Sequence, residues 1–391
     1  MKIRAVLAVA CCLGAAVHPS FAEIGVTDTE ITIGQSAPLT GPNAALGEAI
    51  RDGARVYFET VNSEGGVHGR KIKLISLDDG AEPYPCICNT RKLIDEHKVF
   101  ALFGYVGTAT SYIALPVVAA AKVPFFAPFT GASGLRAPFN KYVFNIRASY
   151  DDETERLVDW LVSQRKKKIA VFYQNDSYGR AGYDGVRTAM EKRKLEITAL
   201  GIVDRNSDEV DNAVKSIAAV KPEAVILVSD YKSSAAFVRS MNKTGLRPDY
   251  LNVSFVGGAA LAAELGPEGH GIIISQTVPY PWDPAFSVAL EYIRLARTQN
   301  VKAKPSFNNI EGYIAAKAFV EGLRRAGRDL TRPKFIAALE TFDKVDLGNF
   351  YLSFSPTNHN GSKYVGMTVI IGSGGGFLPM SEPPKTPARR S

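Results

Sequence analysis

Two turns rich in hydroxyl and glycine residues each follow an apolar run typical of a buried strand. The first, residues 104–111 (GYVGTATS), contains Thr108, and the second, residues 128–133 (PFTGAS), contains Phe129 and Thr130. Glycines permit tight turns, and the N–H groups at the start of a helix are free to bind an anion. The two turns therefore predict a carboxylate site, unless the threonines simply cap helices.

Three later turns, which also follow strand-like runs, supply side chains of a different kind. Tyr178 lies in the turn 174–179 and offers a flat apolar face with a hydroxyl group. Asp230 and Tyr231 form the next turn, and Phe255 lies in the last one. Loops are commonly polar, so these turns indicate a site only if the fold places them opposite the first two.

The chain lacks the residue patterns on which common catalytic and cofactor sites depend. It contains no G-x-S-x-G elbow, no H-E-x-x-H pair and no phosphate loop ending in G-K-S/T, and its five histidines are scattered. Cys86 and Cys88 are too close together for an unstrained bridge and lack further metal ligands nearby. We expect a binding protein rather than an enzyme, with no cofactor or metal and with two partly buried thiols.

Strand-like and helix-like segments alternate along most of the chain. Residues 30–34 alternate polar and apolar, whereas residues 43–62 carry apolar residues at helical spacing, and the same rhythm continues through a strand expected at 250–255. Later helices are expected at 285–298, 308–326 and 333–341, and late strands at 350–354 and 364–371. This pattern predicts an α/β fold with two doubly wound parallel-sheet lobes, whose strand ends face one cleft.

The N-terminal segment predicts export. Lys2 and Arg4 precede an apolar stretch, and small residues at Ser20 and Ala22 suit a signal peptidase, so residues 1–22 read as a signal peptide cleaved after Ala22. The cysteines in this stretch lack the pattern of a lipid anchor. We therefore expect a periplasmic protein.

Charge and composition argue against a nucleic-acid partner. Without the signal peptide the chain carries a net charge of +5, and its one basic tract, residues 165–168, suits a solvated helix end. The proline-rich basic tail, residues 381–391, is expected to be disordered.

Several segments resemble one known family. Residues 33–42 (IGQSAPLTGP), 62–72 (NSEGGVHGRKI) and 123–132 (VPFFAPFTGA) are similar to the leucine/isoleucine/valine-binding proteins, as are Tyr178 with its following glycine and the late helix around Tyr313. Members of that family are extracytoplasmic solute receptors of ABC transporters. The resemblance covers nearly the whole mature chain.

The resemblance implies the type I periplasmic binding fold with a hinge of three crossings. The N-terminal lobe would comprise residues 23–147 plus 280–362, and the C-terminal lobe residues 148–279 plus 363–380, with crossings near 146–148, 277–280 and 361–364. The lobes would close on a small-molecule ligand, and the monomer would present that closed form to an ABC transporter permease in the inner membrane. A sensor that presents the closed form to a membrane signalling receptor is the alternative.

The resemblance also implies roles for individual residues. The implied ligand-binding residues are Thr108, Phe129, Thr130, Tyr178, Asp230, Tyr231 and Phe255. Thr108 would hold the ligand carboxylate with its hydroxyl, the N–H of Phe129 would help, and Tyr178 would cover the ligand from the second lobe.

One departure from the family concerns the ligand. Amino-acid binders of the family pair the ligand ammonium with an acidic residue where this chain has Phe255. A desolvated ammonium without a partner is costly, so a branched-chain amino acid is expected only if Asp230 substitutes. We expect a carboxylate-bearing ligand that is amino-acid-like, an aromatic or aliphatic acid, or an amide.

Overall fold

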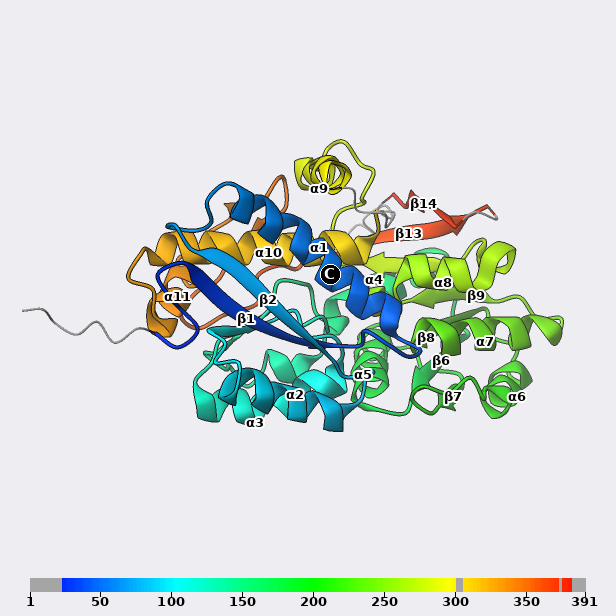
Figure 1. Cartoon of the computed structure of the whole chain (residues 1–391). Coiled ribbons are helices and arrows are strands. Elements are labelled where there is room, and N and C mark those ends of the chain that lie inside the picture. Colours follow the sequence, from blue (N-terminus) through cyan, green and yellow to red (C-terminus); the bar gives the residue numbers. More distant parts are fainter. Residues whose placement is uncertain (1–22, 300–304, 373–374, 382–391) are drawn as a thin grey trace, which may run out of the picture.

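A computed structural model describes residues 23–299, 305–372 and 375–381, so the expected signal peptide and nearly all of the expected tail lie outside it. Within these ranges the chain forms two main sheets, each accompanied by helices (Figure 1). No helix of the described ranges is both long and apolar enough to span a membrane.

The first sheet is built from the N-terminal third of the chain. Its strands are β1 (Glu30–Ala37), β2 (Lys71–Asp78), β3 (Ala101–Phe103), β4 (Phe125–Phe126) and β5 (Val143–Phe144). They run in the order β2-β1-β3-β4-β5, and their pairings are parallel. Ile33 of β1 is fully buried and aligned with Leu74 of β2 and Ala101 of β3, as expected for a parallel sheet covered on both faces.

Helices from both ends of the chain cover this sheet. They are α1 (Ala44–Ser63), α2 (Pro83–Asp95), α3 (Thr108–Ala121), α10 (Phe307–Ala326) and α11 (Arg332–Leu339), with the short helix η1 (Ser133–Leu135). A further helix, α9 (Ser287–Thr298), packs on α1 and α10. In Figure 1, α1 and α10 lie side by side above β1, and α2 and α3 lie below it. Two glycines allow the close contact of α1 with α10, because a Cβ at Gly53 or Gly312 would lie within 2.2 Å of a carbonyl oxygen of the other helix. We call this sheet with its helices the first lobe.

The second sheet forms the other half of the molecule. Its strands are β6 (Ile169–Gln174), β7 (Leu200–Val203), β8 (Ala224–Val228), β9 (Asp249–Asn252), β10 (Ile273–Gln276), β13 (Gly366–Ile371) and β14 (Gly376–Pro379). Their order is β14-β13-β10-β9-β8-β6-β7, and β13 is antiparallel to both β10 and β14. Every residue of the central strand β8 is buried, which explains its uninterrupted apolar sequence.

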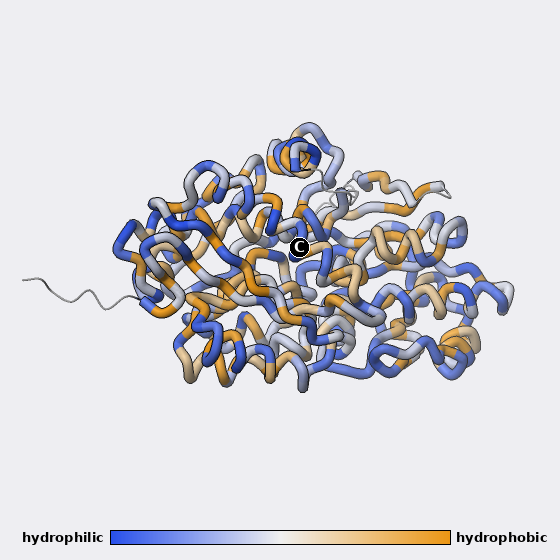
Figure 2. Tube along the Cα trace, in the orientation of Figure 1, coloured by the Kyte–Doolittle hydropathy of each residue, from blue (hydrophilic) through white to orange (hydrophobic). Residues whose placement is uncertain are grey.

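Five helices accompany this sheet in the described residues. They are α4 (Tyr150–Ser163), α5 (Ser177–Glu191), α6 (Asp211–Ala219), α7 (Tyr231–Lys243) and α8 (Gly258–Leu265), with the short helices η2 (Ser254–Val256) and η3 (Gly266–Gly269). Figure 2 shows apolar residues along the strands and hydrophilic residues on the outer turns of the helices. We call this sheet with its helices the second lobe. A separate antiparallel pair, β11 (Val345–Asp346) and β12 (Tyr351–Leu352), lies between α11 and β13 in the sequence.

The chain passes between the two sheets three times. It leaves the first sheet after β5, returns from β10 to the helices α9–α11, and enters the second sheet again at β13. The exact lobe boundaries and hinge crossings given above remain predictions.

The predicted fold class is confirmed, with local corrections. The strand expected at 250–255 ends at Asn252 because η2 follows it, and β14 was not expected. The second sheet is mixed rather than wholly parallel, since β13 runs antiparallel to its neighbours β10 and β14. The two thiols are not both partly buried: Cys86 is buried and Cys88 is exposed, because positions two apart on a helix face different sides.

Candidate functional site

A small cavity lies between the two lobes at the carboxyl ends of several strands. The first lobe contributes Pro38, Asn43, Leu46, Ala81, Val106, Gly107, Thr108, Ala109 and Thr110, and the second contributes Gln174, Asp176, Tyr178, Arg205, Asp230 and Phe255. Its volume is about 30 Å³, room for roughly one or two water molecules. The lobes are therefore closed against one another, and a larger ligand requires them to separate.

The start of α3 forms the polar wall of the cavity on the first lobe. Gly107 precedes the helix with a φ of 110°, a conformation that favours glycine, and no side chain caps the first N–H groups. The hydroxyl of Thr108 lies 2.6 Å from that of Thr130, which donates to the hydroxyl of Tyr150 at 3.3 Å. Uncapped N–H groups beside linked hydroxyls suit a carboxylate.

Two expectations for this region need correction. The threonines are not helix caps, because Thr108 bonds to Thr130 and the hydroxyl of Thr110 donates to the carbonyl of Val106 at 2.7 Å. The N–H of Phe129 is not free for a ligand, since it donates to the carbonyl of Tyr105 at 2.6 Å as the two turns pair.

Aromatic rings from both lobes meet behind this wall. The ring of Phe129, from the first lobe, lies 5.2 Å from that of Phe255, and Tyr178 lies 4.5 Å from Phe255. Tyr150 lies 5.5 Å from Tyr178. Tyr178 and Phe255 line the cavity, whereas Phe129 and Thr130 lie one layer behind it and Tyr231 lies outside its lining.

Two aspartates line the cavity from the second lobe, and each caps a helix. Asp176 accepts hydrogen bonds from the N–H groups of Tyr178 and Gly179, and Asp230 accepts from those of Lys232 and Ser233. Burial raises the pKa of Asp230, the bonds from Ser233 and Lys232 oppose the shift, and the nearby charge of Asp176 adds to it. No basic side chain pairs with either carboxylate among the described residues.

Polar side chains join the lobes at the rim of the cavity. The carboxylate of Glu82, on the first lobe, accepts hydrogen bonds from Arg205 at 2.8 Å and from the side-chain amide of Asn206 at 2.6 Å, both on the second lobe. The side-chain oxygen of Asn206 accepts a hydrogen bond from Asn43 of the first lobe at 3.1 Å. Sequence patterns missed Asn43 and Arg205, because single loop residues far apart in the chain carry no periodic signal. These contacts hold the lobes together in the closed form.

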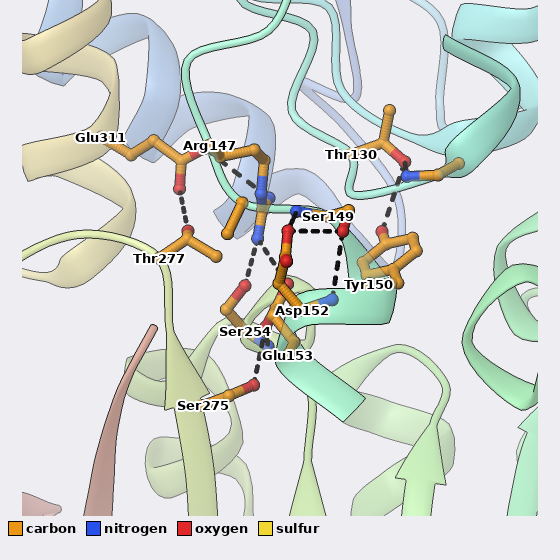
Figure 3. A network of polar contacts seen from close by, with 12 residues as sticks. Thr130, Arg147, Ser149, Tyr150, Asp152, Glu153, Ser254, Ser275, Thr277 and Glu311 are labelled. Atoms are coloured by element: carbon orange, nitrogen blue, oxygen red, sulfur yellow. Dashed lines mark hydrogen bonds and ion pairs between the residues drawn. The ribbon is translucent and has the colours of Figure 1, made fainter. Parts of the chain in front are cut away.

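A buried ionic cluster lies where the chain first crosses between the lobes (Figure 3). Arg147 is fully buried, and its guanidinium forms ion pairs with Glu153 at 3.4 Å and with Glu311 at 3.6 Å. The guanidinium also donates a hydrogen bond to the hydroxyl of Ser254 and lies over the ring of Phe129, 4.5 Å from the ring centroid. Burial alone would lower the pKa of Arg147. The nearby carboxylates of Glu311 and Glu153 have the larger opposite effect, so the pKa of Arg147 lies above its usual value. The cluster thus ties α4 of the second lobe to α10 of the first.

These features define the kind of site. The cavity offers anion-binding groups, aromatic walls and two acidic side chains, but no nucleophile paired with a base. No group of three potential metal ligands occurs in the described part of the chain. Two α/β lobes that meet over a small cavity with polar and aromatic walls are the architecture of a ligand-binding protein.

Comparisons with known proteins also indicate a binding protein. The chain matches the model of the periplasmic binding protein family over residues 30–375. It is 24% identical to "Leu/Ile/Val-binding protein homolog 3" of Brucella melitensis, over 84% of this chain and 88% of that protein. It therefore belongs to the periplasmic binding protein family, which is a family of binding proteins and not of enzymes.

Solved structures support the same fold. The chain is similar to the structure of a possible leucine/isoleucine/valine-binding protein from Rhodopirellula baltica, with 33% identity, a TM-score of 0.85 and coverage of 90% of this chain and 97% of that one. It shares the fold of a fatty acid ABC transporter substrate-binding protein from Thermomonospora curvata, at 22% identity and a TM-score of 0.84, over 92% and 94% of the two chains.

Proposed function

We propose that this protein is the periplasmic solute receptor of an ABC importer and that its lobes close on a small carboxylate-bearing ligand. The observation that carries the proposal is the pair of hydroxyls of Thr108 and Thr130, 2.6 Å apart, beside the uncapped start of α3. A carboxylate accepts hydrogen bonds and carries the charge that a helix N-terminus favours. The names of the two leucine/isoleucine/valine-binding relatives support the class of solute.

Binding begins with the lobes apart. The ligand carboxylate contacts Thr108, which Thr130 supports from one layer behind, and closure brings Tyr178, Asp230 and Phe255 of the second lobe against the rest of the ligand. Phe129 supports Phe255 from behind, and Tyr231, at the start of α7, completes the wall while the cleft is open. The ligand must supply enough contact across the cleft to favour the closed form.

Export and delivery complete the proposal. The signal peptide, residues 1–22, is removed after Ala22, and the mature protein works as a periplasmic monomer. Its lobes, with the boundaries and three crossings given above, turn about the hinge at Arg147 and its neighbours. The closed form then docks on the transporter permease, which takes up the ligand.

A thermal-shift screen tests the proposal. Amino acids, aromatic acids, short aliphatic acids and amides are added singly to the purified mature protein. A true ligand at about a hundred times its Kd adds roughly 2.7 kcal/mol to the free energy of unfolding. At least one acid should raise the Tm of the wild type, and should do so much less for Thr108→Val. A screen in which only uncharged compounds raise the Tm contradicts a carboxylate site.

A further inference from the structure

A surface hollow beside Lys122 and Arg332 lies on the first lobe, at the other end of its sheet from the cavity between the lobes. Its volume is about 540 Å³, large enough for a small organic molecule. Lys122 shortly precedes β4, and Lys141 and Tyr142 precede β5, so this wall of the hollow lies at the amino ends of the strands. In Figure 1, α11, which begins at Arg332, lies at the end of the molecule away from the second lobe. The hollow therefore does not depend on closure of the lobes.

Three basic side chains, Lys122, Lys141 and Arg332, line the hollow. Both lysines are exposed, and neither forms an ion pair in the described residues. The ammonium of Lys141 lies 5.1 Å from the ring centroid of Tyr142, which also lines the hollow. A ring attracts the ammonium but does not neutralise it, so both lysine charges are available to an anion.

The charge of Arg332 also lacks a carboxylate partner in the described part of the chain. Its guanidinium donates to the carbonyls of Val99 at 2.8 Å, Phe100 at 2.9 Å and Ala121 at 3.3 Å, which occupies three of its five N–H groups. These bonds hold the side chain against the first sheet, but neutral carbonyls do not cancel its charge. Burial lowers the pKa of Arg332, and the nearby carboxylate of Glu23 only partly opposes the shift. An oxyanion in the hollow would supply the missing counter-charge.

The two acidic side chains of the lining already have other partners. Glu23 accepts hydrogen bonds from the backbone N–H groups of Ile24 and Arg332, both at 3.1 Å. Glu340 contacts the imidazole of His359 at 3.2 Å. Neither carboxylate forms an ion pair with a basic side chain of the hollow within the described ranges. Three basic and two acidic side chains thus leave the hollow with an excess of positive charge.

The remaining walls of the hollow are apolar. Pro333, Ile336 and Ala337 of α11 form one wall, and Ala121, at the end of α3, lies in the lining together with the ring of Tyr142. A ring or a short alkyl chain attached to the anion would remove this apolar surface from water.

We propose that the hollow is a second binding site, which takes a phosphate monoester or a phosphate headgroup that carries an apolar substituent. The planar guanidinium of Arg332 matches the spacing of phosphate oxygens, and Lys122 and Lys141 add point charges. A dianion is favoured over a monoanion because its attraction to each cation is doubled. The substituent packs against Ile336 and Tyr142. The site is separate from the cavity between the lobes, so its occupancy does not depend on the solute proposed there.

Phenyl phosphate is the probe for a soluble ligand. Amide NMR spectra of the mature protein are recorded at about pH 8, where a phosphate monoester is a dianion. Titration should shift the signals of Lys122, Tyr142 and Ile336, and benzoate, which has a single charge, should bind more weakly. The double variant Lys122→Gln/Lys141→Gln should raise the Kd for phenyl phosphate by about 2- to 30-fold, the combined effect of two exposed charge pairs.

A matched control removes two exposed lysines from the second lobe. Lys215 of α6 and Lys243 of α7 are exposed and lie outside the lining of the hollow. Lys215→Gln/Lys243→Gln changes the net charge equally and should keep the Kd of the wild type. Equal effects of the two double variants would contradict the site, because the net charge alone would then explain the binding.

Vesicles separate the two sources of phosphate. Cosedimentation with vesicles of phosphatidic acid in phosphatidylcholine, lost only in the Lys122→Gln/Lys141→Gln variant, identifies a lipid headgroup. Binding of phenyl phosphate without cosedimentation identifies a soluble monoester, and either result supports the site. The inference is overturned if neither probe binds. It is also overturned if phenyl phosphate shifts the signal of Thr108 and binds more weakly to Thr108→Val, since the probe then lies between the lobes. All four lysines are exposed, so their substitution should leave the fold intact.

Discussion

The hydroxyl oxygens of Thr108 and Thr130 lie 2.6 Å apart, although 22 positions separate them in the sequence. The contact arises because β3 and β4 are neighbours in a parallel sheet, so the turns after them meet at one edge. Thr108 is 1% exposed and Thr130 is 0% exposed, and the pair lies beside the cavity shared by the two lobes.

Thr108→Val should weaken ligand binding while leaving the fold intact. Valine keeps the shape of threonine but removes the hydroxyl, so a bound carboxylate loses one hydrogen bond, worth about 1–3 kcal/mol. Isothermal titration should show a Kd about 5- to 150-fold higher. Thr108→Ser, which keeps the hydroxyl, is the control and should bind nearly as the wild type does. Equal affinity of the valine variant removes Thr108 from the site.

Glu82→Ala should shift the ligand-free protein toward the open form. The variant loses the hydrogen bonds from Arg205 and Asn206 that join the lobes at the rim. Because the ion pair is partly exposed, its contribution is about 0.2–1 kcal/mol, which predicts an affinity that is weaker by about 1.4- to fivefold. Small-angle scattering should give a larger radius of gyration for the ligand-free variant. The exposed Glu64→Ala is the control, and equal radii for all three proteins would exclude a latch at Glu82.

Arg147→Met should destabilise the protein strongly. Removing the guanidinium leaves the carboxylates of Glu153 and Glu311 buried without their counter-charge, a loss of about 3–5 kcal/mol. Urea denaturation should show a lower midpoint. Adding Glu153→Gln and Glu311→Gln to the variant should recover part of the loss, since no buried negative charge then remains. An unchanged midpoint in the single variant would mean that the cluster does not stabilise the folded protein.

The buried carboxylate of Asp79 should give the stability a measurable dependence on pH. Burial raises its pKa to about 6 from 3.8, although the hydroxyl of Ser36 and the N–H of Ala81 donate to it. Between these values the folded state binds more protons than the unfolded state. The free energy of unfolding therefore falls as pH rises through this window, by about 1–3 kcal/mol from this group.

Asp79→Asn is the variant that isolates this effect. It should remove the Asp79 contribution, so the wild type should lose more stability than the variant between about pH 4 and pH 6.5. Chemical denaturation at several pH values measures the difference. Identical slopes for both proteins would show that Asp79 titrates normally.

Much of the fold follows from the sequence, because periodicity reports burial directly. The apolar run of β8 and the helical spacing of α1 each correspond to an element in the structure. The hydroxyl of Thr108 and the ring of Tyr178 reach the cavity because turns after parallel strands share one edge of a sheet. The position of these turns can therefore be predicted from the order of strands and helices alone.

The rest of the site depends on contacts that no local pattern encodes. Asn43 and Arg205 lie on different lobes, and both line the cavity between them. The N–H of Phe129 is occupied by a turn-to-turn hydrogen bond that its sequence position does not reveal. The ion pair of Arg147 with Glu311 joins residues that are far apart in the chain, so no local pattern predicts it.

A crystal structure of the mature protein with the acid identified by thermal shift tests the central claim most directly. We predict a ligand between the lobes, with a carboxylate oxygen within about 3 Å of the Thr108 hydroxyl and with Tyr178 and Phe255 packed against its body. A ligand bound elsewhere, such as in the surface hollow beside Lys122 and Arg332, or one held in the cleft with its carboxylate away from α3, would contradict the account.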